Sequence, residues 1–156
     1  MVFLDDHTVP SNSVNENDIL EHWDWLLGNK LKILIITKMG DVFLSENDGG
    51  VYWLATDVGS LTKVAEGCED FKLQLEKKEN FDNWFLPELV DALENTGKKL
   101  NSGELYSFIN LPILGGEYEV ENIEPCDISV HFTVTGQLQK QIKNLPGGTK
   151  IKINIT

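Results

Sequence analysis

Arginine is absent from this 156-residue chain, and all 13 of its basic residues are lysines. The chain has 25 acidic residues, so its formal net charge is −12 at pH 7. Affinity for nucleic acid depends on neutralising phosphates, and bidentate contacts to guanine or phosphate need a guanidinium group. The composition therefore disfavours direct nucleic-acid binding and favours a basic protein partner, which the charge would steer towards the chain. The alternative is that the acidity only keeps the protein soluble.

Cysteine and long hydrophobic runs are also scarce. The two cysteines, Cys68 and Cys126, are too few for a disulfide scaffold in a chain of this length. Apolar runs such as Ile33 to Ile36 are far too short to cross a bilayer. Polar residues 5–7 follow the first four residues at once, which is unlike a signal peptide. We therefore expect a cytoplasmic protein that makes no membrane contact.

No catalytic or cofactor motif is present in the sequence. The chain has no Gly-x-Ser-x-Gly elbow, no CxxC or HExxH pair, and no glycine-rich phosphate loop. Cys68 precedes Glu69 and Asp70, whose charges disfavour a reactive thiolate. The histidines are isolated from one another and from other metal ligands: His7, His22 and His131. We expect no catalytic residue, no metal site and no cofactor, with His131 on the polar face of a strand.

The first half of the chain predicts one helix followed by a run of strands. Ser13 and Glu16 have capping-box spacing, and apolar residues including Trp23 then recur at helical spacing until Gly28 ends the helix. Four β-type segments joined by short turns follow, at residues 32–38, 42–45, 51–54 and 61–65. Short turns between consecutive strands predict an antiparallel meander.

The second half predicts helices and then strands. Helical spacing covers residues 69–78 and 81–93, with a break at Pro87, which cannot continue a helix. Alternation predicts a half-buried strand at 127–134 and a last strand at 150–155. Between them, the spacing of Leu138, Ile142 and Leu145 predicts a short helix at 138–145. This order predicts an α+β fold, mainly an antiparallel sheet packed against several helices. We expect residues 1–14 to be a loose arm and residues 15–156 to be a single domain.

Two surfaces are candidates for binding a partner. The first is the segment 115–124, the acidic loop, which has two leading glycines as a possible hinge and contains no lysine. Its candidate binding residues are Glu117, Tyr118, Glu119, Glu121 and Glu124. The second surface is on the first helix, where Trp25 lies off the apolar stripe beside Glu21 and Asp24. The alternative for the acidic loop is a solvated surface with no partner.

The motifs around the acidic loop also carry a family resemblance. They are Gly103–Phe108, Pro112-x-Leu114-Gly-Gly-Glu-Tyr118, Asn122, His131, Gly136–Ile142 and Leu145–Gly148, preceded by Gly40–Leu44. In this order, over roughly residues 16–153, they resemble the C-terminal domain family of bacterial type VI secretion immunity proteins, formerly a domain of unknown function. The resemblance implies a cytoplasmic antitoxin that binds a toxic nuclease and blocks its active site. It implies no catalytic residues.

Two other functions stay open at this point. The chain could be a general protein-interaction or regulatory module with no toxin partner, or an enzyme with an unrecognised site. A toxin gene directly upstream would favour immunity over the general module. A large pocket lined by converging polar groups with perturbed pKa values would favour the enzyme.

Overall fold

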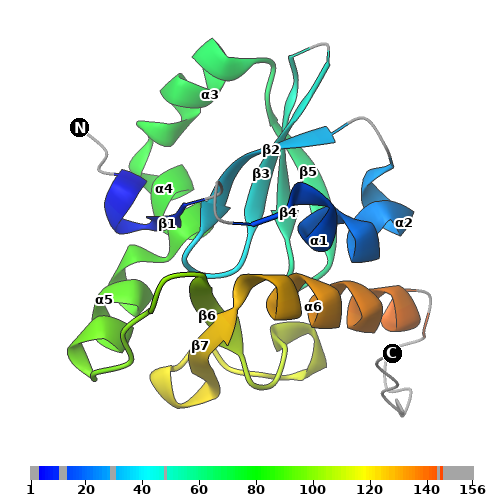
Figure 1. Cartoon of the computed structure of the whole chain (residues 1–156). Coiled ribbons are helices and arrows are strands. Elements are labelled where there is room, and N and C mark those ends of the chain that lie inside the picture. The colour runs from blue at the N-terminus through cyan, green and yellow to red at the C-terminus, as the bar shows by residue number, and fades with distance from the viewer. Residues whose placement is uncertain (1–3, 11–13, 29–30, 48, 144, 146–156) are drawn as a thin grey trace.

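The computed structural model describes residues 4–10, 14–28, 31–47, 49–143 and 145. Its centre is an antiparallel sheet of five strands in the order β1-β2-β3-β4-β5, and a two-stranded sheet, β6-β7, lies below it (Figure 1). The strands of the large sheet are β1 (Thr8–Val9), β2 (Leu31–Thr37), β3 (Val42–Glu46), β4 (Val51–Ala55) and β5 (Ser60–Ala65). The predicted α+β class and the antiparallel meander are confirmed.

Short helical turns cover one face of the large sheet. They are α1 (Glu16–Leu20), η2 (Glu21–Trp23) and α2 (Asp24–Leu27). The side chain of Asn15 caps α1 by accepting from the backbone N–H of Asn17 at 2.9 Å. Gly28, with φ +70°, ends α2 as predicted. The expected capping residue Ser13 lies outside the described residues.

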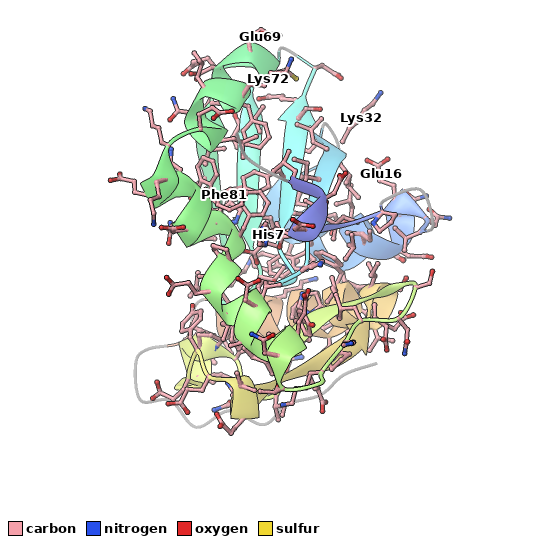
Figure 2. All side chains as sticks on the ribbon, turned by 90° about the vertical axis from the view of Figure 1, so that its left-hand side faces the viewer. His7, Glu16, Lys32, Glu69, Lys72 and Phe81 are labelled. Atoms are coloured by element: carbon pink, nitrogen blue, oxygen red, sulfur yellow. The ribbon has the colours of Figure 1, made fainter. Side chains whose placement is uncertain are left out.

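Three helices follow the large sheet in the chain: the first two pack on its other face, and the third packs against the two-stranded sheet. All three lie on the side of the molecule that faces the viewer in Figure 2. They are α3 (Cys68–Leu75), α4 (Lys78–Phe85) and α5 (Pro87–Asn95). The predicted break at Pro87 is confirmed, and Leu86 before it has φ +49°. A proline disfavours the right-handed helical region for the residue before it, so Leu86 leaves α4 in a left-handed conformation.

Alternation along the strands supplies apolar side chains to both faces. On one face Leu44 is fully buried with Trp23 and with Phe132 of α6. On the other, Phe43 packs against Phe85, with ring centroids 5.7 Å apart. Because neighbouring residues of β3 serve different cores, the sheet is the middle layer of the molecule.

The last described segment contains the main correction to the predicted elements. After β6 (Glu104–Phe108), η3 (Pro112–Leu114), η4 (Val120–Asn122) and β7 (Ile123–Asp127), the chain forms the helix α6 (Ile128–Ile142). The strand predicted at 127–134 is therefore wrong, and the short helix predicted at 138–145 is largely the end of α6. The buried face of α6 carries the polar residues His131, Thr135 and Gln139, which hid the helical period of its apolar residues. No helix in the described part of the chain is long and apolar enough to cross a membrane.

Residues 4–9 pack on the large sheet, which corrects the expected loose arm. Val9 pairs with Ile36 of β2 and is only 9% exposed. The rings of His7 and Phe81 meet edge to face at 5.2 Å, and the two side chains lie close together in Figure 2. Burial of Val9 and the added strand pairing offset the entropy of ordering this segment. The strand predicted at 150–155 lies outside the described residues.

Candidate functional site

A buried group of polar residues joins α6 to the ends of both sheets. We call Gly40, Asp41, Thr56, Ser107 and His131 the His131 cluster. His131 Nε2 lies 2.7 Å from the Gly40 carbonyl oxygen, and Nδ1 lies 2.7 Å from Ser107 Oγ. Because a carbonyl oxygen only accepts, Nε2 carries the proton and the Ser107 hydroxyl donates to Nδ1. His131 is 2% exposed, so its predicted place on a polar strand face is wrong.

Asp41 holds the turn after β2 against the end of β4. Its Oδ2 accepts from Trp53 Nε1 at 3.0 Å, and its Oδ1 accepts from the backbone N–H of Thr56 at 3.0 Å. Burial, and then the charge of Asp57, raises the pKa of Asp41 well above its ordinary value. The hydrogen bonds from Thr56 and Trp53 oppose that rise because they stabilise the charged form.

Close approach of the backbone to α6 completes this junction. A Cβ at Gly40, whose φ is +88°, would lie 2.5 Å from His131 Nε2, so only glycine fits there. About two turns further along the helix face, Gln139 Nε2 donates to the carbonyl oxygens of Thr56 at 3.0 Å and Asp57 at 3.3 Å. The helix is thus fixed to the sheet by side chains that reach backbone groups.

The contact between Ser107 and His131 resembles part of a nucleophile–base pair. However, the second ring nitrogen is bonded to a backbone carbonyl rather than to a carboxylate. Burial lowers the pKa of His131 to about 4, so the ring is a weak base at neutral pH. With the ring only 2% exposed, the geometry fits a structural junction better than a reactive centre.

The acidic loop, in contrast, lies on the surface. Glu117, Glu119, Glu121 and Glu124 are exposed, and Tyr118 is 47% exposed. The Tyr118 hydroxyl donates to the Asp57 carboxylate at 2.5 Å, and its ring packs edge-on against Phe108. Burial, and then the hydrogen bond with Asp57, raises the pKa of Tyr118. The structure therefore brings all five candidate residues of the loop to one exposed segment with a fixed aromatic ring.

Asn122 fixes the conformation of this loop. Its Nδ2 donates to the carbonyl oxygens of Asn110 and Glu117, both at 2.9 Å, and its Oδ1 accepts from the Asn110 N–H at 2.9 Å. A Cβ at Gly116 would lie 1.8 Å from the Asn110 carbonyl oxygen. Glycine at this position allows close packing, so the expected glycine hinge is a tightly packed turn instead.

The three candidate binding residues near the start of the chain differ in their exposure to solvent. Glu21 and Asp24 are exposed, whereas Trp25 is half-buried and donates to the carbonyl oxygens of His22 at 3.1 Å and Gly136 at 3.3 Å. Its ring also stacks on Trp23 and lies 4.9 Å below the Lys143 ammonium. Trp25 therefore serves internal packing. Figure 1 places α2 and β7 on opposite sides of α6, so the two candidate surfaces are separate.

Sequence reasoning missed the His131 cluster as a unit. Its members come from the turn after β2, the end of β4, β6 and α6, and no local pattern links them. Gly40, Asp41, Ser107 and His131 do all lie within the motifs that carry the family resemblance. Motifs that are far apart in the sequence therefore supply the residues of one buried junction.

The architecture is that of an α+β protein with an exposed acidic segment and a buried polar junction. Residues 65–139 match the family described as "T6SS immunity protein Tdi1, C-terminal". The match confirms the family resemblance over these residues and supports an immunity role. The matched segment includes α3 to α5, the acidic loop and His131.

Comparison with curated proteins gives no match. Among solved structures, the crystal structure of Atu4351 from Agrobacterium tumefaciens is similar, with a TM-score of 0.54 and 19% sequence identity. The likeness covers 80% of this chain and 65% of that chain. At this identity the likeness shows the fold alone, and this chain corresponds to under two thirds of the longer protein.

Proposed function

We propose that this chain is a cytoplasmic immunity protein that binds a secreted basic toxin, a nuclease, and occludes its active site. The observation that carries the proposal is the match of residues 65–139 to an immunity family. The net charge of −12 adds physical support. A nuclease needs a basic surface for phosphates, and an acidic protein can occupy that surface by electrostatic complementarity.

The acidic loop is the surface that fits this role best. Residues 100–139 contain six acids and no lysine, and four of those acids lie in the loop. The hydrogen bonds of Asn122 hold the loop in one conformation, which reduces the entropy lost on binding. The exposed apolar side chains of Ile113 and Val58 lie close to the loop. Asp57, which binds the Tyr118 hydroxyl, also accepts from the Ile113 N–H through its carbonyl oxygen at 3.4 Å, and Val58 is the next residue in the chain. An apolar anchor surrounded by charge is a common form of binding hot spot.

Growth rescue tests the proposed function. A candidate partner toxin is induced in cells with or without this chain, and we expect the chain to restore growth. A variant with lysine at Glu117, Glu119 and Glu121 should lose the rescue, because it reverses the charge of the loop. The control is lysine at the exposed residues Glu69, Glu76 and Glu79, which makes the same charge change on α3, on α4 and at the turn between them. Full toxicity with abundant, folded wild-type chain would contradict the proposal.

A further inference from the structure

A hollow of about 450 Å³ lies between the start of α5 and the acidic loop. Apolar groups of Leu86, Pro87, Leu89 and Ala92 line one part of it, and Tyr118 lines another. Leu86 is the one non-glycine residue with a positive φ in the described part of the chain. We call this feature the Tyr118 hollow.

Two carboxylates complete the lining of the Tyr118 hollow: Asp82 near the end of α4 and Glu88 in the first turn of α5. Glu88 is exposed, whereas Asp82 forms an ion pair with Lys78. Asp57 adds a third negative charge nearby, because it accepts the Tyr118 hydroxyl. The hollow thus combines an apolar lining, an aromatic ring and negative charge.

These three features match the chemistry of one long basic side chain. The methylene stem of arginine buries well against apolar groups while its charged head stays at the surface. A guanidinium group is attracted to the face of an aromatic ring and to carboxylates, which it can meet with two parallel hydrogen bonds. The chain supplies no arginine of its own.

We propose that the Tyr118 hollow receives an arginine side chain of the protein partner. This inference rests on the proposed function, since it deepens how the acidic surface recognises a basic toxin. The acidic loop attracts the partner at long range, and the hollow fixes its position through one inserted side chain. The occupant is identified by charge complementarity, because Glu88 and Asp82 line the hollow beside its apolar side chains and Asp57 contacts the hydroxyl of Tyr118.

An NMR titration with a capped Gly-Arg-Gly peptide tests the hollow without the toxin. We expect saturable amide shifts at Leu89, Ala92 and Tyr118. The matched ligand is a capped Gly-citrulline-Gly peptide, which keeps the shape and removes the charge. It should bind about tenfold more weakly, because only the charged head gains from the carboxylates.

Two variants with a matched control make the test specific. Glu88→Lys should weaken the arginine peptide about tenfold or more by replacing attraction with repulsion. Glu69→Lys makes the same change at the second position of another helix, α3, and should leave binding unchanged. Ala92→Leu should also weaken binding, since it fills the hollow without any change of charge.

Three results would each overturn this inference. They are equal affinity for the two peptides, amide shifts spread over other acidic surfaces, and the absence of a saturable shift. None of these results bears on toxin binding, which growth rescue measures separately. Conversely, failure of growth rescue with specific binding of the arginine peptide would count against the proposed function and leave the hollow as an arginine-binding surface.

Discussion

Trp23 has the largest fully buried side chain among the described residues. It lies in η2, in the core shared by the first helical turns, the sheet and α6. Trp23→Ala should lower the free energy of unfolding by about 3–5 kcal/mol, as expected for truncation of a large buried aromatic residue. A denaturant titration measures this loss. Leu73→Ala is the control, because Leu73 is 66% exposed and its loss should cost under about 0.5 kcal/mol.

His131 should remain neutral well below the ordinary histidine pKa of 6.5. Burial lowers its pKa to about 4, and the hydrogen bond to Gly40 only partly opposes that shift. In an NMR titration, the ring signals of His131 should stay constant down to about pH 5, while a capped histidine peptide titrates near 6.5. Titration of His131 in the folded protein near pH 6.5 would show that the His131 cluster is open to solvent.

The same shift links stability to pH. Between pH 6.5 and about 4 the unfolded chain binds a proton at His131 that the folded chain does not, so folding stability falls as the pH falls through this window. Asp41 acts in the opposite direction, because its raised pKa makes the folded state bind a proton more readily than the unfolded state. The ring signals of His131 therefore test its own contribution more directly than a melting curve of the whole chain.

At the scale of elements, the sequence predicts the helices and strands that are specified by neighbouring residues in the chain. The meander follows from β-branched runs joined by short turns, and the break at Pro87 follows from the missing N–H of proline. The helix α6 was missed because its contacts are tertiary. Its residues His131 and Gln139 are polar yet buried, since their partners are backbone groups far away in sequence. The local sign of the helix is Asp127, whose side chain caps it by accepting from the Val130 N–H at 3.1 Å.

The candidate site likewise has features that the sequence shows directly and features that depend on the fold. The acidic loop is visible in the sequence as a run of acids without lysine, and the structure places its residues on the surface. The Tyr118 hollow is not visible, because it needs α5 and the loop to lie side by side. The partial burial of Trp25 is not visible in the sequence either, since its partners Gly136 and Lys143 lie more than a hundred residues away.

Gly136 tests the close packing between α6 and η2. A Cβ at this position would lie 2.4 Å from the carbonyl oxygen of His22. Gly136→Ala should therefore destabilise the protein by about 1–3 kcal/mol through overpacking, although alanine is by itself the better helix former. Lys140→Ala, at an exposed position of the same helix, should have little effect on a denaturant midpoint. A stabilised Gly136→Ala variant would contradict the packing described here.

At the scale of the whole molecule, the charge distribution sets how a partner approaches. Changing Glu117, Glu119 and Glu121 to glutamine keeps their size and removes three charges. Association with the toxin that the chain protects against should slow, with a smaller change in dissociation, because exposed charges act mainly on the association rate. The rate for the wild-type chain should also fall as salt rises, since screening shortens to about 8 Å at physiological ionic strength. Surface-plasmon kinetics at two salt concentrations measures both effects, and unchanged association in the variant would identify the loop as a solvated surface.

Inhibition of the toxin is the most direct test of the proposal that this chain occludes a nuclease. DNA cleavage by the purified toxin that the chain protects against is measured while the chain is titrated into the reaction. We expect cleavage to fall in proportion to added chain and to stop near equimolar amounts, because each bound chain covers one active site. Full cleavage in the presence of a large excess of folded chain would contradict it.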